Sequence, residues 1–144
     1  MVVDSYPPEI RSASHLMKEL AEELNSRGYK VIVVTSYPRY NLVDKVETDT
    51  FDTVTIEDNI KVIRVKSPPI HNVNFVLRGL SQIIMPHLFS ANIRKYLKDK
   101  IDVVIVYSPP LPLAGIGRNI KRRSGAKFIL NVQDLFPQNA IDLD

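Results

Sequence analysis

The residues of this sequence that can do chemistry lie in loops that follow short apolar runs. In an open parallel sheet, ligands bind outside the carboxyl ends of the strands. That rule selects four stretches rich in proline, hydroxyl or charged residues, at 6–13, 35–41, 108–113 and 133–139. Loops of this composition cannot build a core, so a functional role is the better explanation for them.

The first of these loops can hold an anion. It reads Tyr6-Pro7-Pro8-Glu9-Ile10-Arg11-Ser12 and lacks the glycine-rich patterns of dinucleotide and nucleotide-triphosphate sites. The backbone N–H groups that open the following helix favour a negative charge, and Arg11 adds a full positive one. His15, on the same first turn, can contact a phosphate. The alternative is that Pro7-Pro8 only stiffens a turn and Ser12 caps the helix.

The last loop holds the best candidate for proton transfer, Asp134. It follows an apolar run directly and stands beside Gln133. A carboxylate in this place can act as a base or accept hydrogen bonds from a sugar hydroxyl. The alternative is that Asp134 caps a short turn. No second carboxylate is obviously paired with it, which argues against a two-carboxylate glycosidase.

Alternating strands and helices must position these loops. Apolar runs predict strands over 2–6, 30–36, 53–56, 60–66, 102–107 and 127–132, and helical spacing predicts helices over 12–27, 74–98 and 113–123. Pro86 is expected to break the second helix. The runs within 30–36, 102–107 and 127–132 are apolar on both faces, which is typical of buried parallel strands. The alternation predicts an α/β fold with a Rossmann-like, doubly wound and mostly parallel sheet.

The composition is that of one ordinary globular domain, with 144 residues, 44% of them hydrophobic and 24% charged. The absence of cysteine excludes disulfides, zinc–thiolate sites and cysteine nucleophiles. The histidines lack metal-ligand spacing, so we expect neither a metal site nor a cofactor. No signal peptide opens the chain and no apolar stretch is long enough to span a membrane, so we expect an intracellular protein.

Charge is distributed unevenly along the chain. Residues 1–60 carry six Lys/Arg and eleven Asp/Glu, whereas residues 61–144 carry thirteen and five. The basic part suits an anionic partner, which can be nucleic acid, a phosphorylated ligand or a membrane surface. The segment 75–98 mixes apolar residues with Arg78, Arg94, Lys95 and Lys98. It forms either core against the sheet or core with additional peripheral contact to an anionic membrane.

Several of these residues together resemble the opening of a known enzyme family. Ser5-Tyr6-Pro7-Pro8-Glu9 is followed by Leu20-Ala21, by Arg27-Gly28-Tyr29-Lys30-Val31 and by Val33-Val34-Thr35. This order is similar to that of the retaining, GT-B-type glycosyltransferases of family four. Residues 36–41 and 131–137 resemble the subgroup that builds bacterial and archaeal surface polysaccharides, the colanic-acid and amino-sugar transferase type.

The resemblance implies an enzyme of two Rossmann-like domains. Residues 1–144 would form a single, incomplete amino-terminal domain that holds the acceptor. A carboxyl-terminal domain absent from this chain would bind the nucleotide-sugar donor, so the chain alone should not catalyse transfer. The full enzyme would work without a metal and place a sugar on a glycan or lipid-linked acceptor. It would be cytoplasmic, peripheral on the inner face of the cell membrane.

The resemblance also implies roles for single residues. Asp134 would bind or deprotonate the acceptor hydroxyl, beside Gln133, where the family often has a histidine. Arg11, Ser12 and His15 would face the sugar phosphate, with Arg11-Ser12 in place of the family's glycine pair.

The same resemblance implies which residues contact the acceptor. The acceptor side of the cleft would be lined by Tyr37, Arg39 and Tyr40. The two tyrosine rings would stack on a sugar ring there.

A second hypothesis comes from a different class of protein. A non-catalytic, Rossmann-like module would bind a phosphorylated small ligand through the same loops. It predicts saturable binding by this chain alone and no second domain. Nucleic-acid binding ranks third, because the aromatic residues lie in the loops and do not interleave a basic stripe. We therefore expect no nucleic-acid partner.

Overall fold

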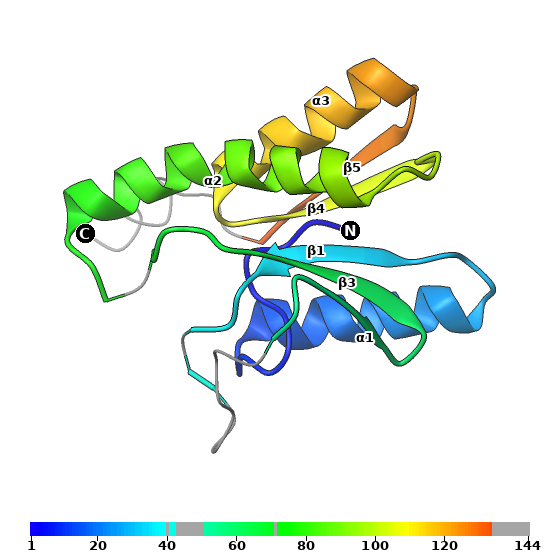
Figure 1. The fold of residues 1–144 in the computed structure, drawn as a ribbon, viewed down its shortest axis with the longest axis horizontal. Coiled ribbons are helices and arrows are strands. Elements are labelled where there is room, and N and C mark those ends of the chain that lie inside the picture. The colour runs from blue at the N-terminus through cyan, green and yellow to red at the C-terminus, as the bar shows by residue number, and fades with distance from the viewer. Residues whose placement is uncertain (40, 43–50, 71, 134–144) are drawn as a thin grey trace.

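A computed structural model of the chain describes residues 1–39, 41–42, 51–70 and 72–133 (Figure 1). The predicted α/β class is confirmed. The elements are α1 (Ser12–Ser26), β1 (Ile32–Ser36), β2 (Val54–Glu57), β3 (Ile60–Val65), α2 (Phe75–Tyr96), β4 (Val103–Ser108), the 3-10 turn η2 (Leu111–Leu113), α3 (Ala114–Ser124) and β5 (Lys127–Val132). Gly28 and Gly125 follow α1 and α3 with φ of 87° and 73°, the left-handed geometry that ends a helix.

The strands form two small sheets. One has the order β1-β3-β2, in which β1 and β3 run parallel and β2 pairs antiparallel at the edge. The other is the parallel pair β4-β5. Residues 1–3 lie between the two sheets, because Val2 bridges Val34 of β1 and Val106 of β4, both in parallel. The strand predicted over 2–6 is thus present as backbone bridges and not as a full strand.

Helices cover the strands from both sides (Figure 1). On one side α1 packs Met17 and Ala21 against Val33 and Val62. On the other side α2 and α3 share a second core with strands of both sheets. Its buried members are Val2, Val34, Ile63, Val65, Met85, Phe89, Ile93, Val104, Val106, Leu113 and Ile116. Neighbouring residues such as Val33 and Val34 therefore point into opposite cores, as expected for strands covered on both faces.

The expectation of a fully buried third strand is wrong. In β5 the side chains alternate between exposed and half-buried, and Ile129 is 50% exposed. Val103 of the neighbouring strand β4 is 46% exposed. The reason is that α3 covers one face of the β4–β5 pair. The helix on the other face of the strands, α1, packs over β1 and β3 instead. An apolar run on both faces therefore did not by itself indicate burial on both faces.

The expected break at Pro86 is also wrong, because α2 is one helix from Phe75 to Tyr96 with Pro86 inside it. A proline in a helix costs about 3 kcal/mol through its missing N–H and its ring. Met85, Phe89 and Ile93 lie along one buried side of this helix. Each such buried side chain contributes about 1.5–3 kcal/mol, so core packing outweighs the cost of the proline.

Glycine is required where α3 meets β5. A Cβ placed on Gly117 would clash with the aromatic ring of Phe128, whereas a Cβ on Gly115 would meet nothing within 4 Å. We expect Gly117→Ala to lower the free energy of unfolding by about 1–3 kcal/mol, because the ring must move within a packed core. Gly115→Ala should leave it unchanged or raise it by up to about 1 kcal/mol. Urea unfolding of the two variants measures the difference, and equal stabilities would contradict the close packing.

Candidate functional site

Two adjoining cavities lie where the carboxyl ends of the parallel strands meet. Asp4 follows the bridging residues 1–3, Ser36 ends β1, Ser67 follows β3 and Pro109 follows β4, and all four residues line a cavity. The volumes are about 320 and 240 Å³. The walls common to both are Asp4, Arg11, Ile70 and Asn72. Three of the four loops predicted from the sequence thus contribute to one region.

Asp4 and Arg11 form the ion pair shared by the two cavities. Arg11 Nη1 lies 2.8 Å from Asp4 Oδ2, and the Asp4 side chain is only 2% exposed. Arg11 is the N-cap residue of α1, with extended backbone and no side-chain cap. Arg11 therefore lies at the helix start as predicted, but its charge is already opposed by a buried carboxylate. Sequence analysis did not identify Asp4 as part of the site.

Glu9 and Arg39 connect the proline loop (residues 6–13) to the loop after β1. The backbone N–H of Arg39 donates to Glu9 Oε1 at 2.8 Å, and Arg39 Nη1 donates to the Ser67 carbonyl at 3.0 Å. Glu9 is buried and Arg39 is exposed, and both line the smaller cavity. These bonds position the guanidinium of Arg39 at the wall of the smaller cavity, and its role in binding an acceptor stays a prediction.

Tyr37 also lines the smaller cavity, and its ring and hydroxyl both have partners. The hydroxyl lies 3.2 Å from Thr53 Oγ1, and Lys66 Nζ lies 5.4 Å from the ring centroid. A cation over one face of an aromatic ring leaves the other face for a ligand. Stacking of a sugar on Tyr37 is therefore limited to one face of the ring.

Three other predicted residues lie away from the cavity walls. Ser12 and His15 are on the exposed side of the first turn of α1, and neither lines either of these two cavities. Gln133 is exposed, its side chain donates to Asn131 Oδ1 at 2.6 Å, and its backbone N–H donates to the Ser108 carbonyl at 3.1 Å. Asp134 and Tyr40 lie outside the described residues.

The start of α2 contributes wall residues that sequence analysis did not assign to the site. Arg78 and Gln82 line the larger cavity, together with Asn72 just before the helix. Arg78 and Gln82 are four residues apart, so they share one side of the helix. The spacing of four residues could be seen in the sequence, but no sequence pattern indicated that this side of the helix faces the proline loop.

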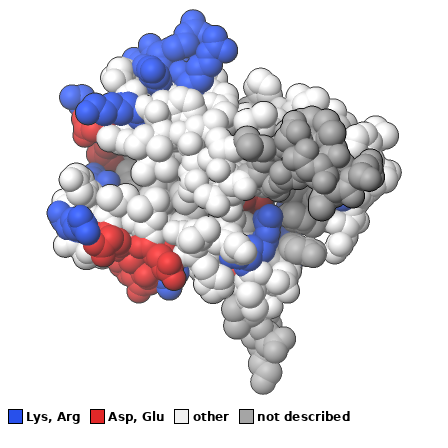
Figure 2. Space-filling model, turned by 180° about the vertical axis from the view of Figure 1, so that it is seen from behind, with Lys and Arg blue, Asp and Glu red and all other residues white. Residues whose placement is uncertain are grey.

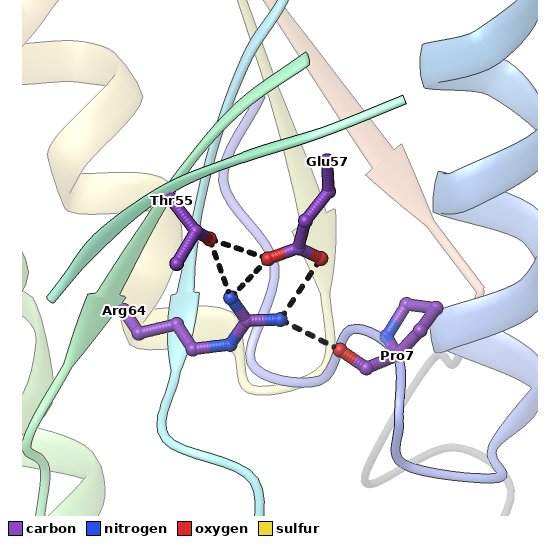
Figure 3. Close-up of polar contacts among 4 residues, drawn as sticks. All are labelled: Pro7, Thr55, Glu57 and Arg64. Atoms are coloured by element: carbon purple, nitrogen blue, oxygen red, sulfur yellow. Dashed lines mark hydrogen bonds and ion pairs between the residues drawn. The ribbon is translucent and has the colours of Figure 1, made fainter. Parts of the chain in front are cut away.

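A buried arginine, Arg64, is hydrogen-bonded to the proline loop (Figure 3). Arg64 of β3 is 1% exposed and forms a two-pronged ion pair with Glu57 of β2. Its Nη1 also contacts Thr55 Oγ1 at 2.9 Å, and its Nη2 donates to the Pro7 carbonyl at 2.9 Å. The ring of Phe51 lies 4.7 Å from the guanidinium carbon. Arg64 thereby connects the edge of the sheet to the loop that forms the cavity wall.

The charge of Arg64 changes the titration of its partner. Burial by itself would raise the pKa of Glu57, but hydrogen bonds from Arg64 and Thr55 and the guanidinium charge lower that pKa below its ordinary value of 4.5. Burial, with a smaller effect of the nearby Glu57 carboxylate, raises the pKa of Tyr6 to about 12. At neutral pH the Glu57 carboxyl is therefore ionised and the Tyr6 hydroxyl keeps its proton.

Within residues 1–39, 41–42, 51–70 and 72–133, no three His, Asp or Glu side chains gather as metal ligands would. Among the helices of the described ranges, none is long and apolar enough to cross a bilayer. The cavity walls instead offer guanidinium, carboxylate and amide groups, which recognise hydroxyl and anionic groups through hydrogen bonds.

We expect Glu57→Gln to make the free energy of unfolding less dependent on pH under acidic conditions. Because the folded-state pKa of Glu57 is lowered, its contribution is complete above pH 4.5 and is lost as the pH falls through the folded-state value. Glutamine does not titrate, so the variant should not lose this contribution to stability as the pH falls. At neutral pH it should cost about 1–3 kcal/mol, because Arg64 stays buried without its charge partner.

The matched control for this prediction is Glu23→Gln. It breaks an exposed pair with Arg27 at 2.6 Å, which is expected to change stability by less than about 0.5 kcal/mol. Denaturant unfolding between neutral and acidic pH compares the two variants. An unchanged acid limb in Glu57→Gln would show that the Arg64–Glu57 pair does not carry the pH dependence.

The sequence matches no protein-family model. No curated protein is similar enough to match it. What the site can do must therefore be judged from its geometry and from the residues that line it.

Proposed function

We propose that this chain is the acceptor-binding domain of a retaining glycosyltransferase that moves a sugar from a nucleotide-sugar to a lipid-linked glycan in cell-surface polysaccharide synthesis. The observation that carries the proposal is the pair of cavities at the carboxyl ends of the parallel strands, walled by the proline loop and the start of α1. The Ser5–Glu9 run that resembles family four lies in this same region. The enzyme would be cytoplasmic and peripheral on the inner face of the membrane.

The proposal includes a Rossmann-like, doubly wound arrangement. Counting the bridging residues 1–3 as a strand gives the order β2, β3, β1, residues 1–3, β4 and β5, with every pairing parallel except that of β2. In that order β1 and β4 flank residues 1–3, and the later parallel strands β3 and β5 lie outside them. Ligands of such sheets bind where the order reverses. The larger cavity lies there, between Asp4 and Pro109.

The wall chemistry supports a ligand that carries hydroxyl and anionic groups. Arg11, Arg39 and Arg78 offer positive charge, while Asp4 and Glu9 moderate it. Arg78 forms no ion pair with any described residue. In the proposed enzyme these side chains orient the acceptor, and Asp134 accepts the proton of its hydroxyl or hydrogen-bonds to it. The donor would be held mainly by the domain that follows, without a metal.

A non-catalytic module for a phosphorylated small ligand is the second candidate. One observation favours it: the cavity walls carry the guanidinium groups of Arg11, Arg39 and Arg78, which suit a phosphate group. The two functions differ in whether sugar is transferred and in whether the chain binds its ligand alone.

Transfer of labelled sugar into lipid tests the proposal. The protein expressed from its own gene is incubated with membranes and a panel of labelled nucleotide-sugars, and label is counted in the lipid fraction. We expect Arg78→Gln to lower transfer roughly tenfold to a hundredfold, because it removes a charge-assisted hydrogen bond to the ligand. Asp134→Ala should abolish transfer, and the 144-residue chain alone should be inactive.

Arg27→Gln is the matched control, because it removes the same charge from an exposed site remote from the cavities. It should leave transfer unchanged. Full transfer by Asp134→Ala would keep the enzyme but remove Asp134 from the site. No transfer with any donor, together with saturable binding of a sugar phosphate by the chain alone, would establish the binding module instead.

A further inference from the structure

The outward side of α2 carries an apolar stripe over its first half. Val76, Leu80 and Ile83 follow helical spacing and are 78%, 52% and 63% exposed. Phe75, Leu77 and Ile84 are also exposed around the same turns. The buried residues Ser81, Met85, Phe89 and Ile93 lie on the opposite side. Surface Leu, Ile and Phe scattered singly need no explanation, but six within ten residues form a patch, which marks an interaction site.

The same stripe becomes cationic over the second half of the helix. Continuing at steps of three and four from Ile83, it passes the exposed residues His87, Ala91 and Arg94 and reaches Lys98 just beyond the helix. One side of α2 is therefore apolar at one end and positive at the other. Arg94 and Lys98 form no ion pair with any described side chain.

The neighbouring helix extends the positive end. α3 packs in the same layer as α2, since both contribute to one core. Its exposed cations are Arg118, Lys121, Arg122 and Arg123, and they too lack acidic partners among the described residues. In the sequence no Asp or Glu stands between Asp58 and Asp99, or between Asp102 and Asp134. Figure 2 shows Lys and Arg gathered at the α3 end of the molecule, with an acidic patch at the opposite side.

We propose that the outward side of α2 and α3 docks on an anionic lipid bilayer. We call it the α2–α3 surface, defined by Val76, Leu80, Ile83, Arg94, Lys98, Arg118, Lys121 and Arg122. The first turns of α2 insert their aliphatic side chains between the headgroups, and the cations lie against the lipid phosphates. Charge complementarity favours an anionic bilayer as the partner. The two helices contain no acidic residue, so their layer repels cations and attracts an anionic surface.

The apolar residues distinguish a bilayer from nucleic acid. Aliphatic side chains gain free energy by leaving water for a lipid interface, whereas a phosphodiester backbone offers them no such environment. The stripe also lies on the far side of α2 from the core that this helix shares with the strands. Membrane docking therefore leaves the cavities free, and it does not depend on which ligand they bind.

Tryptophan fluorescence tests the insertion directly, because the chain contains no tryptophan. Ile83→Trp places one reporter in the proposed lipid contact. Ile56→Trp is the matched control, since Ile56 of β2 is equally exposed, at 68%. On addition of vesicles of phosphatidylcholine with phosphatidylglycerol, we expect the emission of Ile83→Trp to shift to shorter wavelength and that of Ile56→Trp to stay unchanged. Pure phosphatidylcholine vesicles should produce little shift.

Vesicle sedimentation tests the charge. Arg118→Gln, Lys121→Gln and Arg122→Gln combined should weaken binding by about a hundredfold, at roughly fivefold for each cation near the surface. Lys18→Gln and Arg27→Gln combined remove two positive charges from α1, on the other side of the strands, and should have little effect. Val76→Gln, Leu80→Gln and Ile83→Gln combined should also abolish sedimentation. Circular dichroism of each variant checks that these exposed substitutions leave the fold intact.

Several results would overturn the proposal. These are no binding to anionic vesicles, an equal loss in the α1-side control, or an equal shift of both tryptophans. Self-association that the apolar variant disrupts would instead assign the α2–α3 surface to a second copy of the chain. Binding to duplex DNA without binding to vesicles would assign it to nucleic acid. The inference deepens the membrane contact named in the proposed function; because none of these measurements involves sugar transfer, they test that contact separately from the chemistry.

Discussion

The rest of the structure depends on the backbone hydrogen bonds of residues 1–3. The N–H of Val2 donates to the Ile105 carbonyl at 2.8 Å, and the N–H of Val3 donates to the Val34 carbonyl at 3.1 Å. One short segment thus joins the β1 sheet to the β4 sheet. It also delivers Asp4 and the proline loop to the point where the strand ends converge. The shared core under α2 and α3 contains residues of both sheets, which this segment joins.

The site is supported by two ion pairs of different character. Asp4–Arg11 lies in the cavity walls, where a ligand can compete for the guanidinium. In the other pair, Arg64 is bonded to Glu57 and also donates a hydrogen bond to the Pro7 carbonyl of the proline loop. A buried pair gains little net stability, because desolvation offsets the attraction between its charges. The Arg64–Glu57 pair instead positions the proline loop relative to the ends of the strands, through the hydrogen bond from Arg64 to Pro7.

Much of the fold could be predicted from local pattern, and the errors have identifiable causes. The spacing of Met17 and Ala21, with Gly28 behind them, correctly predicted α1, because a helix with one apolar side is a local property. The break at Pro86 was wrong because packing at Met85 and Phe89 outweighs a local penalty. The burial of Ile129 was wrong because it depends on which face another element covers, and the strand itself carries no such information.

The same division holds for the candidate site. By itself the sequence determined which loops follow strands, and hence that residues 6–13, 35–41 and 108–113 contribute to one edge. Only the tertiary structure decided that Asp4 pairs with Arg11, that Arg78 and Gln82 face the proline loop, and that Ser12 and His15 point elsewhere. The physical reason is that strand ends follow from periodicity along the chain. The direction in which a helix side faces instead follows from the packing of segments far apart in the sequence.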